Sequence, residues 1–221
     1  RLYFSETMLQ HVHNLWMSDE AHFHLSGYTN KQNSRYWALE NPQELHQPPL
    51  HSPKVTVWCA ISSMGIIGPY FFEDHNENAL TVNAARYTDM INQFLTQQLN
   101  MFPQNNSWFQ QDGATSHTAR ASMDSVRRLF PGRVISRHGD IEWPPRSPDL
   151  TACDYFLWGY LKSKVFIDKP RDIRELKMKI REEIANIPLD MLRRVMQNFN
   201  VRLQECMERR GGHLAGIIFK K

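Results

Sequence analysis

The sequence predicts an α/β domain in which a mixed β-sheet carries helices on both faces. Three strand-like runs open the chain, and helical and strand-like segments alternate from about residue 81 onward. Two amphipathic helical segments close it. A series of strands followed by alternating helices and strands is typical of a mixed sheet between layers of helices.

The three opening strands are predicted from apolar, β-branched and aromatic residues. Residues 14–19 are largely apolar and end on Asp19, residues 54–62 carry the strongest strand signal, and residues 66–73 follow after a turn. The connection over residues 26–53 is polar and contains four prolines. A connection of this length inside a compact domain usually has a function or is disordered.

The remaining elements follow from apolar residues at helical spacing and from turn residues. We expect helices from a Thr81 cap to about residue 99, over 116–130 and over 151–165, with strands over 107–111 and 134–136. Helices over 171–210 finish the chain. Five strands in this order are those of a ribonuclease H-like domain with extra C-terminal helices. The first and fourth strands would then be neighbours, with Asp19 and Asp112 at adjacent ends.

Composition limits the class of protein. The 221 residues suit one domain, and 41% of them are hydrophobic, which is enough for a real core. The longest apolar run, over residues 55–72, is interrupted by serines, glycines and a proline and predicts no membrane span. Three widely spaced cysteines favour a reducing compartment over a disulfide framework. Residues 1–111 carry a net charge of −4 and residues 112–221 carry +7. This asymmetry suits contact with a polyanion, although ordinary solvated helices would also account for it.

Acidic residues at the ends of adjacent central strands are costly, because buried carboxylates repel each other and lose hydration. They are favourable where a divalent cation neutralises them, and Mg²⁺ and Mn²⁺ prefer such oxygen ligands. A third ligand is expected in the helix after Asp149. We favour Asp154, which borders an apolar run, and expect Asp149 to be a helix N-cap. Asp149→Asn should then change stability by well under ~1 kcal/mol, because Asn caps nearly as well.

Three segments resemble the acidic motifs of transposases in the Tc/mariner superfamily. They occur in the order of that family and include the strings DGATSHTA and SPDLTACD. The segments are Met17–Glu20, Phe109–Arg120 and Arg146–Tyr155. The resemblance covers roughly residues 14–165.

The resemblance implies a catalytic domain that cleaves transposon ends and transfers the freed strand into target DNA. Asp19, Asp112 and Asp154 would be its catalytic, metal-binding triad, holding two Mg²⁺ ions for which Mn²⁺ could substitute. No small-molecule cofactor is implied. The partners would be double-stranded DNA, with terminal inverted repeats as substrate and TA as target, and a second copy of the chain. Residues 26–53 fall where the family places a clamp that reaches the other subunit, and the family acts in the nucleus.

Two departures from the family pattern stand out. The 41 residues between Asp112 and Asp154 form a longer spacer than in the best-known mariner members. We expect the extra residues in a loop around residues 137–143. The family's N-terminal helix-turn-helix DNA-binding region is also absent from this sequence, so we expect residues 1–221 to form a single catalytic domain.

Two other functions remain open at this point. A host-captured or decayed transposase would keep the fold as a DNA-binding or dimerisation module, and a ribonuclease H-like nuclease would cut without joining. The role of His117 is also open, since it could position DNA or water or cap the following helix. Six arginines around the second and third motifs could contact phosphates or be ordinary surface charge. They are Arg120, Arg127, Arg128, Arg133, Arg137 and Arg146.

Overall fold

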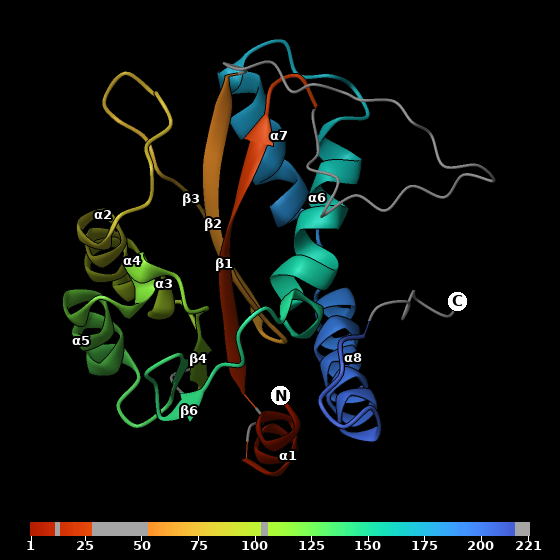
Figure 1. The fold of residues 1–221 in the computed structure, drawn as a ribbon. Helices are drawn as coiled ribbons and strands as arrows, with labels where there is room; N and C mark the ends of the chain where they lie inside the picture. The colour runs from red at the N-terminus through yellow and green to blue at the C-terminus, as the bar shows by residue number, and fades with distance from the viewer. Residues whose placement is uncertain (12–13, 28–52, 103–105, 215–221) are drawn as a thin grey trace.

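A computed structural model describes residues 1–11, 14–27, 53–102 and 106–214 (Figure 1). The segment 26–53, which was predicted to be a clamp, therefore lies almost wholly outside the described residues. Helix α1 (Leu2–His11), which the sequence did not predict, precedes the sheet. The strands are β1 (Leu15–His24), β2 (Lys54–Ser62), β3 (Gly65–Phe71), β4 (Trp108–Gln110), β5 (Val134–Ser136) and β6 (Ile141–Glu142).

The sheet has the order β3-β2-β1-β4-β5-β6. Strands β1, β2 and β3 are antiparallel neighbours, whereas β4 pairs parallel with β1, and β5 and β6 continue in parallel. The mixed ribonuclease H-like sheet is thus confirmed, with one strand more than the five predicted. The added strand, β6, falls in the segment 137–143 that was predicted to be a loop. Asp140 and Trp143 attach this segment to β5 through hydrogen bonds to Val134 and Ser136.

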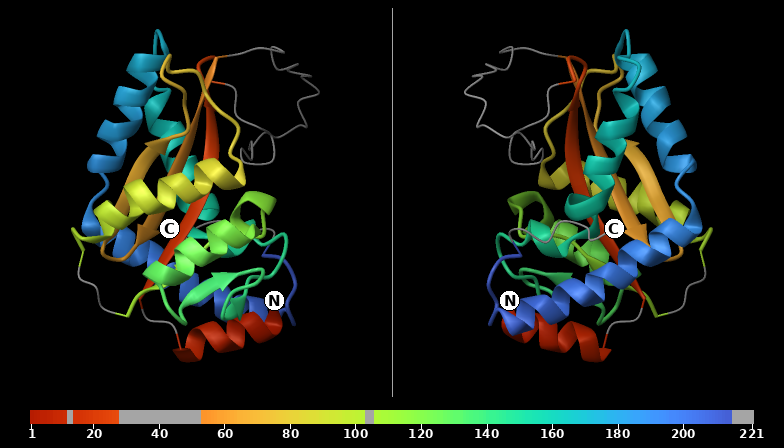
Figure 2. Two further views of the ribbon diagram at one scale, coloured as in Figure 1. Left: turned by 90° about the vertical axis from the view of Figure 1, so that its left-hand side faces the viewer. Right: turned by 90° about the vertical axis from the view of Figure 1, so that its right-hand side faces the viewer.

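Helices cover both faces of the sheet (Figures 1 and 2). One face packs against α2 (Ala84–Asp89), a π-helical turn (Met90–Leu95), α3 (Thr96–Leu99) and α5 (Arg120–Leu129). The other packs against α6 (Trp158–Val165), α7 (Ile173–Ala185) and α8 (Leu189–Glu208). Alternate residues of β1 enter the two cores, with Trp16 on the first side and Leu15 and Met17 on the second. None of the described helices is both long and apolar enough to cross a bilayer.

Strand β1 is longer than predicted, so Asp19 lies in its middle and not at its end. Met17 is opposite Gln110, the last residue of β4. Beyond that rung, β1 continues to His24 paired with β2 alone among the strands. Because Asp19, Glu20 and His22 are polar, the sequence did not predict this continuation of β1. Because β4 ends before the level of Asp19, no described strand pairs with β1 on that side of Asp19.

Three predicted helices differ in detail. The helix expected from Thr81 begins after Asn83, whose side chain accepts a hydrogen bond from Arg86 N at 2.9 Å. The helix expected over 116–130 is divided at Ala119, whose ψ of 142° separates α4 (Thr115–Thr118) from α5. The helix expected over 151–165 begins with a π-helical turn over Cys153–Leu157. A π turn adds one residue to a helical turn and often occurs at functional sites.

Asp149 is not a helix N-cap, which corrects the prediction made for it. It lies in a 3₁₀ turn (Pro148–Leu150), where its carboxylate accepts two hydrogen bonds from the Arg1 guanidinium, at 2.9 and 2.6 Å. Leu214 N donates a third at 2.8 Å, and Arg202 donates to the Asp149 carbonyl. Burial would raise the pKa of Asp149, but Arg1 and these donors lower it below its ordinary value. Asp149 thus links Arg1 just before α1, Arg202 of α8 and Leu214 after α8 to the same 3₁₀ turn.

Asp149→Asn should destabilise the protein by about 2 kcal/mol, because it removes the charge that pairs with a largely buried Arg1. Asp172→Asn is the matched control. Asp172 is a true N-cap, accepting from Glu175 N at 2.8 Å, and Asn caps nearly as well as Asp. Urea unfolding of both variants measures the difference. Equal, small losses would show that the Arg1–Asp149 pair contributes nothing.

Candidate active site

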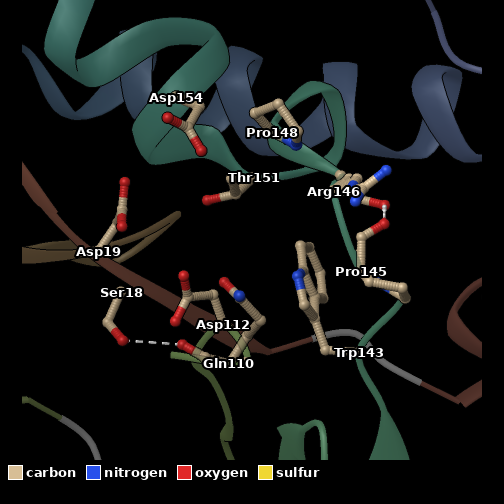
Figure 3. A pocket seen from close by; sticks show the side chains of 12 residues that line it. Ser18, Asp19, Gln110, Asp112, Trp143, Pro145, Arg146, Pro148, Thr151 and Asp154 are labelled. Atoms are coloured by element: carbon tan, nitrogen blue, oxygen red, sulfur yellow. Dashed lines mark hydrogen bonds between the residues drawn. The ribbon is translucent and has the colours of Figure 1, made fainter. Parts of the chain in front are cut away.

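A cavity of about 330 Å³ opens where β4 ends. Asp19 reaches it from β1, Asp112 from the chain just after β4, and Asp154 from the π-helical turn Cys153–Leu157. The structure therefore brings all three predicted residues to one cavity, and Figure 3 shows their carboxyl groups facing a common space. The other lining residues come from the same strands and from the segment before Asp154. They include Ser18, Gln110, Gly113, Trp143, Arg146 and Thr151.

Asp19 is fixed from the helical layer behind it. Its Oδ2 accepts a hydrogen bond of 2.8 Å from the indole N–H of Trp158, which is 1% exposed. Burial raises the pKa of Asp19 well above its ordinary value, and the negative charge of Asp154 adds to the shift. The hydrogen bond from Trp158 opposes it. Nothing in the sequence around Trp158 connects it to a residue 139 positions earlier.

The ionised form of the Asp154 side chain is also disfavoured. Burial, and after it the negative charge of Asp112, raise its pKa to about 7, and the positive charge of Lys162 partly offsets them. Lys162 lies two turns further along the helix and is attracted to both Asp154 and Asp19. The cavity thus holds two carboxyl groups whose ionisation is opposed by burial and by neighbouring charge.

Asp112 has the opposite shift. Burial would raise its pKa, but His117 and the backbone N–H of Ala114 lower it. Both donate to Oδ1, His117 Nδ1 at 2.6 Å and Ala114 N at 2.9 Å. On its other side, His117 donates from Nε2 to Glu20 Oε1 at 3.1 Å. Burial opposes the charge on His117, but Glu20 and Asp112 outweigh it and raise its pKa to about 10.

This arrangement excludes two of the uses considered for His117. Its side chain is 3% exposed, which leaves no surface for DNA. Ala114 and Ala119 occupy the N-cap positions of α4 and of the following helix α5, so His117 caps neither helix. It contacts Asp112 and Glu20 instead. The one sequence signal for this contact was its position five residues after Asp112.

The chemistry of the cavity fits a hard divalent cation. In the described part of the chain, no three His, Cys, Asp or Glu side chains already converge closely enough to hold an ion. The three carboxylates nevertheless face one space and disfavour one another's charge. A cation there would relieve that repulsion, and carboxylate oxygens are the ligands that Mg²⁺ and Mn²⁺ prefer.

The six arginines differ in their surroundings. Arg127, Arg128 and Arg133 donate to acceptors within the protein, and Arg120 lies 3.8 Å from Asp124. Arg137 packs beside Gly113, next to Asp112. Arg146 lines the cavity itself and has a left-handed backbone with φ of 54°. Such a conformation is costly for a residue with a side chain and is often found at functional sites.

Comparison with known proteins supports this description of the chain. No protein-family model matches it. The Tc3 transposase of Caenorhabditis elegans is 24% identical over 198 residues, which are 88% of this chain and 55% of that protein. The chain thus spans about half the length of this relative.

The fold is that of the Mos1 mariner transposase catalytic domain. The solved structure of that domain matches with a TM-score of 0.71 and 20% identity, covering 96% of this chain and 92% of that one. Mos1 transposase in a paired-end complex with the left transposon end matches with a TM-score of 0.74 and 20% identity, covering 96% and 61%. The Mos1 strand transfer complex gives 0.74 and 21%, covering 97% and 61%.

The sequence similarity to the Tc3 transposase extends over 88% of this chain. The chain is thus similar in sequence to the Tc3 transposase and in fold to the catalytic domain of the Mos1 mariner transposase.

Proposed function

We propose that this chain is the catalytic domain of a DNA transposase that cleaves transposon ends and joins them to target DNA. The observation that carries the proposal is the meeting of Asp19, Asp112 and Asp154 in one cavity. Similarity to the Tc3 transposase, and a fold shared with Mos1 in its paired-end and strand transfer complexes, support it.

The three aspartates would hold two divalent cations, Mg²⁺ or Mn²⁺. Mos1 structures have been solved with each of these metals. When bound, such ions activate an attacking oxygen and stabilise the leaving oxygen of a phosphodiester. The chain's own residues supply the geometry: Trp158 holds Asp19, His117 holds Asp112, and the π-helical turn presents Asp154.

The reaction needs no nucleophile from the protein. Water would attack a phosphorus atom at the transposon end and release a 3′-hydroxyl, which would then attack a phosphodiester of the target strand. Each step exchanges one P–O bond for another. The work of the protein is positioning and charge stabilisation, which account for most of phosphoryl-transfer catalysis.

Further features of the proposal rest on the family resemblance. The substrate would be double-stranded DNA ending in terminal inverted repeats, and the target would be TA. The protein would act as a homodimer in the nucleus, with residues 26–53 reaching the partner. These features remain predictions.

Asp154→Asn should abolish metal-dependent nicking of transposon-end DNA, by several orders of magnitude, because it removes a negative charge that the cations need. Binding to the same DNA should persist, since it depends on Lys and Arg. Nicking and gel-shift assays in Mg²⁺ measure the two effects, with Asp149→Asn assayed below its melting temperature as the control. Loss of nicking in folded Asp149→Asn with full activity in Asp154→Asn would mean that the third ligand is wrongly assigned.

The metal-free protein should lose stability as pH rises. Between the ordinary Asp pKa near 4 and its folded-state pKa of about 7, Asp154 stays protonated only in the folded protein, so each rise in pH favours unfolding. Asp154→Asn should therefore melt several degrees above wild type at pH 8 in EDTA, with a smaller difference at pH 5. Adding Mn²⁺ should stabilise wild type more than the variant. An equal difference at both pH values would contradict the idea.

Arg146→Gln should weaken binding of DNA at the cavity. Arg146 is exposed, lines the acidic cavity and has no carboxylate partner among the described residues, so a phosphate is a suitable ligand. Losing one phosphate contact should lower the dependence of log K on log salt by about 1. Arg194→Gln, on exposed α8 and paired with Asp190, is the control. An unchanged salt slope for Arg146→Gln would remove Arg146 from the DNA interface.

A further inference from the structure

Glu20 and His117 form a largely buried pair beside the cavity, and neither of them lines it. They approach Asp112 from the face of the sheet opposite to Asp19, because Asp19 and Glu20 are consecutive on β1 and point to opposite faces. The His117 side chain is 3% exposed and the Glu20 side chain 16%. The His117 ring nitrogen Nδ1 lies 2.6 Å from Asp112 Oδ1, and Nε2 lies 3.1 Å from Glu20 Oε1.

The His117 ring is held from several directions. It packs against the ring of Tyr87, with centroids 4.2 Å apart. The Tyr87 hydroxyl donates to Gln111 Oε1 at 2.8 Å, and Gln111 Nε2 donates to the His117 carbonyl at 3.0 Å. Gln111 is the neighbour of Asp112 in the chain and is fully buried. The ring therefore cannot turn without disturbing a packed network.

The two carboxylate oxygens of Asp112 therefore differ in their hydrogen-bond partners. Oδ1 accepts from both His117 Nδ1 and Ala114 N. Oδ2 has no hydrogen-bond donor among the residues that the structure describes, and the Asp112 side chain is 49% exposed. One oxygen is thus committed to the protein, and the other remains available to a ligand in the cavity.

We propose that Glu20 and His117 are positioning residues of the active site, which orient Asp112 so that Oδ2 meets the cation. Both ring nitrogens face carboxylates, so the ring donates from both, and Glu20 fixes the end of the ring remote from Asp112. Metal-binding side chains are commonly held by such outer hydrogen bonds, whose loss costs 10–100-fold in metal affinity. The inference rests on the proposed metal-dependent function.

Two substitutions at one position separate positioning from packing. The amide nitrogen of Asn lies near the place of histidine Nδ1, and that of Gln near Nε2. His117→Asn therefore keeps a donor for Asp112, whereas His117→Gln keeps one for Glu20 only. Mn²⁺ binding to the DNA-free chain, measured by electron paramagnetic resonance, should weaken about 10–100-fold in His117→Gln and about threefold or less in His117→Asn. A merely structural role would lower the melting temperature of both without separating their Mn²⁺ affinities.

Glu20 provides a second pair of variants should substitutions at His117 prevent folding. Glu20→Gln keeps an oxygen that accepts from Nε2 and should retain Mn²⁺ affinity within about threefold. Glu20→Met has a similar size but no such acceptor, and should bind Mn²⁺ at least ~10-fold more weakly. Equal affinities within each pair would overturn the inference.

The failure of this inference and that of the proposed function can be distinguished. If wild type binds Mn²⁺, Asp154→Asn does not, and the His117 and Glu20 pairs show no separation, only the positioning role is wrong. If wild type binds no Mn²⁺, or Asp154→Asn binds it as well as wild type does, the metal site fails and the positioning role fails with it.

Discussion

The short parallel pairing of β1 with β4 is the constraint on which the site depends. The two strands share only three residue pairs, the last of them Met17 with Gln110. Asp19 and Asp112 each follow that rung by two residues, so the pairing sets both at one level. A one-residue shift in register would turn Asp19 to the other face of the sheet. A longer β4 would fill with backbone the space that the carboxylates now share.

Both faces of β1 contribute to the site through this opening. On the face of α6, the buried Trp158 donates to Asp19. On the opposite face, α4 brings His117 between Glu20 and Asp112. Consecutive residues of one strand therefore engage helices of two different layers. The sheet is covered on both sides, and hydrogen bonds from residues that are themselves packed hold Asp19 and Asp112 in place.

The sequence predicted the sheet and the convergence of three acids because these depend on local signals. The run over residues 54–62 and the apolar segments before Asp19 and Asp112 are strand-like without reference to the rest of the chain. Other features depend on distant residues and have no such signal. Asp149 pairs with Arg1 across 148 positions, and Trp158 donates to Asp19 across 139. The second half of β1 is masked by its polar residues, and the π-helical turn at Asp154 depends on packing that periodicity does not reveal.

The repulsion among the cavity carboxylates has a consequence for how such a gene decays. If Asp19 and Asp154 have the proposed catalytic role, neutral substitutions there would remove a charge that burial opposes and so stabilise the fold while abolishing activity. Function and stability would then be opposed at these positions, as in many active sites. An inactivated copy would therefore escape the protein quality control that removes most damaged products. It would remain abundant and folded, and would compete with active copies for the same DNA.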